Sequence, residues 1–161
     1  MTLADFNALP DKRAEEGLLR CCGSKEWARK MAGFRPYDSV DELHKTATDI
    51  WWALTEQDWL EAFSHHPRIG ERDKAAGWAR DEQSATKDVA SDVMKQLARA
   101  NKDYEDRFGH VFLIYATGRT ADDMLASLNQ RMKNDARGEL RNAAAEQAKI
   151  TKLRLEKLIN D

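Results

Sequence analysis

Cysteine and proline are scarce in this chain of 161 residues, which contains two cysteines and three prolines. The cysteines, Cys21 and Cys22, are neighbours, and a disulfide between adjacent residues would be strained. We therefore expect two reduced thiols, as in a cytosolic protein. They also lack the CxxC spacing of a zinc site. Because no Pro-rich, Gly-rich or low-complexity linker is visible, we expect one domain over residues 1–161.

Long apolar runs and clustered charge of one sign are also missing. No run approaches the roughly 20 apolar residues that cross a bilayer. The formal net charge is -2, with acidic and basic residues interspersed, so no basic face indicates nucleic-acid binding. The first five residues do not resemble a secretion signal, and the last three are not a peroxisomal SKL-type signal. We expect a cytoplasmic protein with neither a membrane nor a nucleic-acid partner.

The dominant pattern that is present is helical. Apolar residues recur three and four positions apart, as on one face of a helix. Ser39 and Glu42 have the spacing of a capping box, Thr120 is a predicted N-cap, and Gly109 is a predicted C-cap. One predicted helix ends at residue 22 and another ends near residue 63. The other predicted helices cover residues 24–31, 39–54, 89–108, 120–132 and 135–159.

The predicted fold is an all-α, single-domain bundle of about seven or eight helices. Only Val111 to Tyr115 looks strand-like, and one strand without a partner makes no sheet. We expect this segment to be a buried extended stretch or a helical turn. In the last helix, the predicted buried face consists of Leu140, Ala144, Ala148, Leu155 and Ile159.

Two segments, 64–80 and 109–119, escape the periodic pattern, and irregular segments on a helical scaffold often carry function. In the first, Pro67 disfavours a helical conformation for His66, which is therefore expected at a helix exit. An imidazole there suits proton transfer at neutral pH. The alternative is that His65 and His66 are only polar residues at a helix end.

Three further side chains are candidates for binding. Glu82 and Gln83 offer a carboxylate next to an amide, and these can form hydrogen bonds with the N–H and C=O groups of a ureide. Arg154, at the edge of an apolar stripe, offers a planar fork to a carboxylate or a carbonyl. The alternatives are a solvated glutamate near a helix N-terminus and an arginine that only flanks the core.

Two other functions are compatible with single features. A metal-dependent hydrolase would use His65, His66 and Glu71, but adjacent histidines point in different directions and an HExxH motif is absent. A non-enzymatic interaction module would use the tryptophans as a binding surface. These are Trp27, Trp51, Trp52, Trp59 and Trp78.

Taken in order, several motifs match one family. They are His66 to Glu71 (HPRIGE), Trp78 followed by Glu82-Gln83, Arg107 to Gly109, Val111 to Tyr115, and Leu153 to Leu155. The chain resembles the OHCU decarboxylase family, which acts on 2-oxo-4-hydroxy-4-carboxy-5-ureidoimidazoline during the oxidation of urate to allantoin. The resemblance spans nearly the whole chain.

The resemblance implies roles for individual residues. It implies a catalytic histidine, glutamate and arginine at His66, Glu82 and Arg154. It also implies substrate binding by Pro67, Gln83 and the backbone of Phe112, Leu113 and Ile114. The chain departs from the family at Ala79, where a substrate-binding serine is common, and Ser84 is a candidate replacement.

The resemblance further implies a cofactor-independent carboxy-lyase, a homodimer, and (S)-allantoin and CO2 as products. A decarboxylase needs an electron sink, which many enzymes take from a cofactor. This substrate carries its own sink, a conjugated imidazoline C=N next to the departing carboxylate. None of the eight glycines belongs to a recognisable nucleotide- or phosphate-binding loop, so no cofactor is expected. No metal is expected either, because the histidines lack the spacing of metal ligands.

Overall fold

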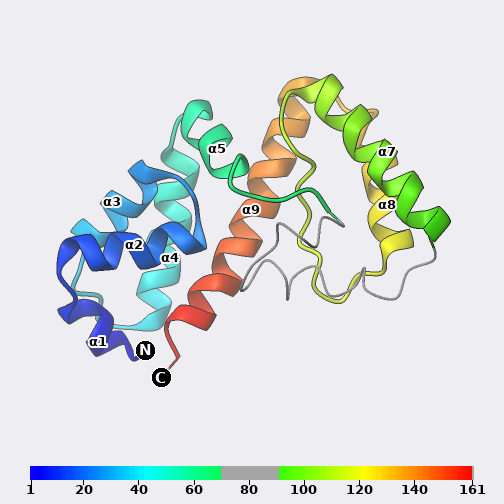
Figure 1. Cartoon of the computed structure of the whole chain (residues 1–161). Coiled ribbons are helices and arrows are strands. Elements are labelled where there is room, and N and C mark those ends of the chain that lie inside the picture. The colour runs from blue at the N-terminus through cyan, green and yellow to red at the C-terminus, as the bar shows by residue number, and fades with distance from the viewer. Residues whose placement is uncertain (70–90, 161) are drawn as a thin grey trace. The chain divides into compact units, whose positions relative to one another are not determined.

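The computed structural model describes residues 1–69 and 91–160, and within that part it contains eight helices (Figure 1). Among these residues there is no strand, so the prediction of an all-α fold is confirmed. The short first helix was not among the predicted elements. The helices are α1 Leu3–Ala8, α2 Asp11–Cys21, α3 Lys25–Gly33, α4 Val40–Ala53, α5 Glu56–Phe63, α7 Ser91–Phe108, α8 Ala121–Arg131 and α9 Ala136–Leu158.

The helix ends form where the sequence predicts them. The hydroxyl of Ser39 accepts a hydrogen bond from the amide of Glu42 at 3.1 Å and begins α4. Thr120 and Asp123 form a reciprocal capping box at the start of α8. Gly109 ends α7 with φ of 80°, a conformation that favours glycine, and its amide donates to the Glu105 carbonyl at 2.8 Å. Local chemistry therefore fixes the helix boundaries that flank the irregular segment 109–119.

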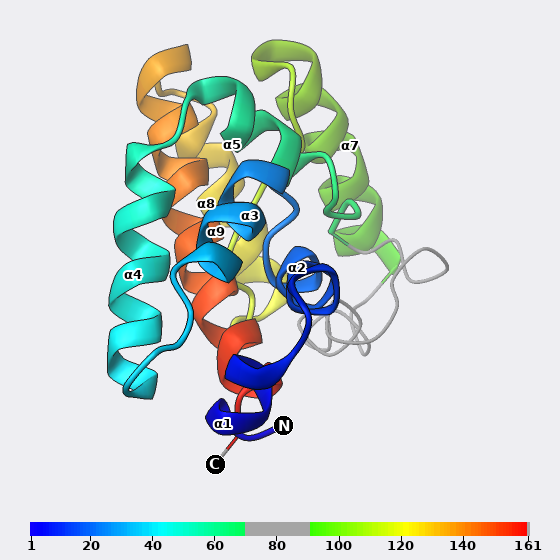
Figure 2. The ribbon, with the colours of Figure 1, turned by 90° about the vertical axis from the view of Figure 1, so that its left-hand side faces the viewer.

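The described chain divides into two compact units, of which the first is Met1–Ala62 together with the chain from Ala148 onward. Its core contains Trp27, Leu43 and Leu155, all almost fully buried. The Trp27 indole donates to the Ala47 carbonyl at 3.1 Å, which ties α3 to α4. The C-terminal part of α9, red in Figure 2, runs beside α4. This unit holds Arg154.

Both cysteines lie in the first unit, where they are buried and form no disulfide, as expected for reduced thiols. Burial raises the pKa of the Cys22 thiol to about 12, so the thiol stays protonated and unreactive near neutral pH. Of the tryptophans in the described part, Trp27, Trp51 and Trp59 are core residues, and only Trp52 is exposed, at 39%. The tryptophans therefore serve mainly as core packing, and Trp78 lies outside the described residues.

The second unit is Phe63–Gln147. Its core joins α7, α8 and the irregular segment 111–116, which is neither strand nor helix. Ile69 packs on the edge of this core, which brings the segment after α5 against it. The buried residues of this core are Leu97, Tyr104, Phe112, Ile114, Ala116, Ala121, Met124 and Leu128.

None of the helices in the described ranges is both long enough and apolar enough to cross a bilayer.

Candidate active site

His66 lies just past the end of α5, as predicted from Pro67. The helix ends at Phe63, and the His66 amide donates to the Phe63 carbonyl at 3.1 Å. The side chain is half-buried, and its Nε2 lies 2.6 Å from Oε1 of Gln147 on α9. An amide oxygen can only accept, so in this contact Nε2 carries the hydrogen. Hydrogen bonds at both the backbone amide and the ring therefore hold His66 in place.

The chain that follows His66 is fixed by α7. The guanidinium of Arg68 forms an ion pair with Glu105 at 2.7 Å. The carbonyl of Ile69 accepts a hydrogen bond from the side-chain Nδ2 of Asn101 at 3.4 Å. Asn101 is itself 2% exposed, so this bond anchors the segment to the core. Together these contacts restrict how far the His66 backbone can move.

The segment Phe112 to Ile114, predicted to contact substrate through its backbone, is buried and is held at Leu113 and at the residue that follows it, Tyr115. Its three side chains are between 1% and 4% exposed. The Leu113 carbonyl accepts a hydrogen bond from Nη1 of Arg131 at 2.6 Å. The amide of Tyr115 donates to the Glu146 carboxylate at 3.0 Å. The Leu113 carbonyl and the Tyr115 amide are therefore held in one orientation, as a binding wall requires.

A buried ion pair with Glu139 holds Arg131 where its guanidinium can donate to the Leu113 carbonyl. Glu139 is completely buried, and its carboxylate receives the Arg131 guanidinium at 2.8–2.9 Å and the Tyr104 hydroxyl at 2.7 Å. The guanidinium also lies 4.5 Å from the centre of the Phe112 ring. Burial and the hydrogen bond to Glu139 raise the pKa of Tyr104 well above its usual value, so its hydroxyl remains a donor.

Arg154 lies in the first unit, on the C-terminal part of α9. Its Nη1 donates to the Arg20 carbonyl at 3.4 Å, at the end of α2. Its positive charge also acts on the Cys22 thiol, whose pKa it lowers against the larger effect of burial. The side chain is half-buried, as expected for a residue at the edge of an apolar stripe. Its proximity to His66, which lies in the second unit, stays a prediction.

Three polar residues near these candidates were missed by the sequence analysis: Glu139, Glu146 and Gln147. All are on α9, and Glu139 and Gln147 are completely buried. The predicted face placed Leu140 inside, but Leu140 is half-buried and Glu139 takes the core position. A usable signal exists, because Glu139, Ala143 and Gln147 recur every four residues and so share one helical face.

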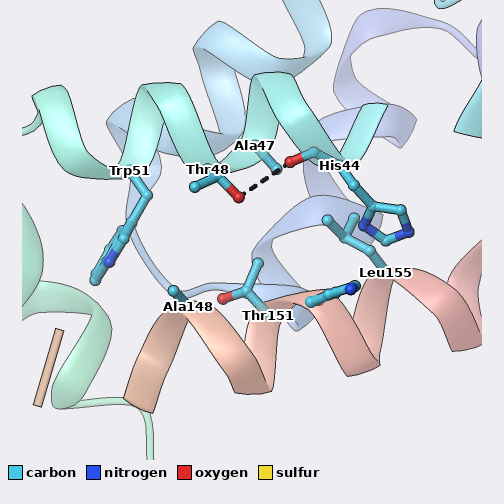
Figure 3. A pocket seen from close by; sticks show the side chains of 8 residues that line it. His44, Ala47, Thr48, Trp51, Ala148, Thr151 and Leu155 are labelled. Carbon is cyan, nitrogen blue, oxygen red and sulfur yellow. Dashed lines mark hydrogen bonds between the residues drawn. The ribbon is translucent and has the colours of Figure 1, made fainter. Parts of the chain in front are cut away.

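Figure 3 shows a small cavity in the first unit, between α4 and α9. Its volume is about 20 Å³, enough for one water molecule and too small for a ureidoimidazoline. Nδ1 of His44 is buried there and has no hydrogen-bond partner in the described part of the chain. Burial lowers the pKa of His44, so the ring is neutral at neutral pH. This cavity is therefore a packing feature of the first unit.

Several candidates lie outside the described residues. They are Glu71, Ala79, Glu82, Gln83 and Ser84, so their predicted roles stay predictions. Within residues 1–69 and 91–160, no three His, Cys, Asp or Glu side chains gather as metal ligands would.

The geometry defines an all-helical protein in which an oriented histidine follows a helix and a fixed backbone segment lies in the same unit. The sequence profile of the family described as OHCU decarboxylase matches residues 7–156. That match covers most of the chain, so the chain belongs to the OHCU decarboxylase family.

Individual relatives agree with this assignment. The Arabidopsis thaliana uric acid degradation bifunctional protein TTL is 40% identical over 88% of the chain and 46% of its own length. The chain thus spans less than half of that relative. The Haloferax volcanii 2-oxo-4-hydroxy-4-carboxy-5-ureidoimidazoline decarboxylase is 25% identical over 96% of the chain and 94% of its own length.

A solved structure also shares the fold. It is the crystal structure of an OHCU decarboxylase in the presence of (S)-allantoin, with a TM-score of 0.82 and 39% sequence identity. The match covers 95% of this chain and 100% of the other.

Proposed function

We propose that this chain is a cofactor-independent decarboxylase that converts 2-oxo-4-hydroxy-4-carboxy-5-ureidoimidazoline to (S)-allantoin and CO2. It acts as one catalytic domain over residues 1–161. Membership of the OHCU decarboxylase family over residues 7–156 supports this. The observation that carries the proposal is the fixed imidazole of His66, which lies in the HPRIGE motif and is held at 2.6 Å by Gln147.

The proposed roles follow from the chemistry of each group. His66 contacts the hydroxyl and carboxylate at the reacting carbon and helps to deliver the proton. Glu82 and Gln83 bind the N–H and carbonyl groups of the ring and ureido arm. Arg154 stabilises negative charge on the ring carbonyl or carboxylate. Pro67 lies against the substrate, and the backbone of 112–114 forms a wall of the site.

Decarboxylation leaves the electron pair of the broken C–C bond on the ring carbon, and the conjugated C=N of the substrate delocalises it. The protein must hold the carboxylate out of the ring plane, stabilise the charge that develops, and protonate one face. A buried and rigid backbone at 112–114, with Leu113 held by Arg131, suits the first of these tasks.

The test is turnover of freshly generated substrate by the purified chain. We expect accelerated CO2 release and optically active allantoin, because protonation from one fixed group gives one enantiomer. The uncatalysed reaction has no preferred face. EDTA should leave the rate unchanged, whereas inhibition by EDTA would show that the reaction depends on a metal ion. A rate and an optical rotation equal to those of a buffer control would overturn the proposed function.

We also propose that the partner of this chain is a second copy of itself. Family resemblance implies a homodimer, and the first unit exposes large apolar side chains that a partner could cover. Phe34 is 62% exposed, Trp52 39% and Leu60 38%. Static light scattering should give twice the mass of one chain at micromolar concentration. A monomer mass at all concentrations tested would contradict this proposal.

The cytoplasm is the proposed compartment, since neither Cys21 nor Cys22 forms a disulfide. Fractionation of the producing cells tests this assignment, and recovery of the protein in a secreted or membrane fraction would contradict it.

A further inference from the structure

Gln147 is a buried amide that faces the candidate catalytic histidine. Its side chain is 0% exposed, in a helix position where an apolar residue is expected. Its Oε1 lies 2.6 Å from Nε2 of His66, a short contact for a hydrogen bond between a nitrogen and an oxygen. Because the oxygen only accepts, the contact requires a hydrogen on Nε2. A neutral His66 ring then has its lone pair on Nδ1.

The surroundings keep this contact in place. The His66 amide is bonded to Phe63, and α7 holds the chain at Arg68 and Ile69. The neighbouring residue on α9, Glu146, accepts from the Tyr115 amide. Two successive residues of α9 thus hold the His66 imidazole and the backbone amide of Tyr115. Such support around a reactive group is what fixes its geometry and its tautomer.

We propose that Gln147 is a positioning residue that holds His66 in the Nε2–H tautomer, so that Nδ1 takes up and releases the proton of the reaction. The inference rests on the proposed function. When CO2 leaves, the electron pair of the C–C bond remains on the ring carbon. The imidazolium Nδ1–H gives its proton to that carbon, and the neutral ring regains a proton from solvent. The bond from Nε2 to Gln147 is unbroken throughout.

The test is ring ¹⁵N NMR of the histidines in the full chain without substrate, with His66 assigned by its loss in His66→Asn. At about pH 8.5, where unperturbed histidines are neutral, the wild-type His66 should be the Nε2–H tautomer. Gln147→Met, which has a similar shape but no acceptor oxygen, should give a mixture of tautomers. Gln147→Glu should keep the proton on Nε2. A wild-type Nδ1–H tautomer, or an unchanged tautomer in Gln147→Met, would overturn the inference.

Kinetics supply the second measurement. Gln147→Met should lower kcat about tenfold, the value of one hydrogen bond, with little change in KM, and Gln147→Glu should recover part of the loss. The matched control is Gln130→Met on the exposed face of α8, which should match wild type. If the wild-type chain shows no turnover, the proposed function fails while the tautomer spectra still decide the role of Gln147. If it turns over and Gln147→Met matches wild type in kcat, the inference alone fails.

Discussion

Replacing His66 with alanine is expected to lower kcat by a factor on the order of 10² to 10⁴, the usual contribution of a general acid or base. The helical circular dichroism spectrum should stay unchanged, because the side chain is half-buried after the end of α5 and outside the core of either unit. The measurement is steady-state allantoin formation together with the far-ultraviolet spectrum of each purified variant.

His65→Ala is the matched control. His65 is the preceding residue, has the same side chain and is exposed, so its loss should leave kcat near the wild-type value. Glu82→Ala extends the experiment to the second residue that the family resemblance implies to be catalytic. Full activity in His66→Ala would reject the assignment of the active site. Equal losses in His65→Ala and His66→Ala would indicate disruption of the segment rather than removal of a catalytic group.

Most of the fold could be predicted because its helix ends are encoded by short-range chemistry. Ser39, Thr120 and Gly109 each act through a bond or a backbone angle within a few residues of their position. The helix that ends at Phe63 was likewise predicted from the proline that follows His66. The helix α1, with six residues, is too short to show an apolar period, and so it was not predicted.

The site could be predicted only in part, because its supporting contacts join residues far apart in sequence. The His66 position follows from the adjacent Pro67, but its partner Gln147 is 81 residues away. A search for apolar stripes also assigns polar residues to the surface by default. Glu139 violates that assumption, since it is buried through an ion pair with Arg131. A polar residue on a predicted buried face therefore indicates a partner elsewhere in the chain.

Replacing Glu139 with alanine is expected to lower the free energy of unfolding by about 3–5 kcal/mol, the cost of leaving one member of a buried ion pair alone. Arg131 would retain a charge at 9% exposure, and the Tyr104 hydroxyl would lose its acceptor. Urea unfolding followed by circular dichroism measures the change. Glu156→Ala, at an exposed position of the same helix, should change the free energy by less than about 0.5 kcal/mol.

The double variant Glu139→Leu with Arg131→Met separates the effect of the buried charges on stability from the effect of side-chain packing. It removes both charges, so it should be more stable than Glu139→Ala, even though the Leu113 carbonyl loses its donor. Because that donor orients the 112–114 segment, the double variant should regain stability but bind substrate more weakly than wild type, so its KM should be higher than the wild-type value. A Glu139→Ala variant as stable as wild type would show that the ion pair does not support the core. A double variant with wild-type KM would show that Arg131 does not orient the proposed binding wall.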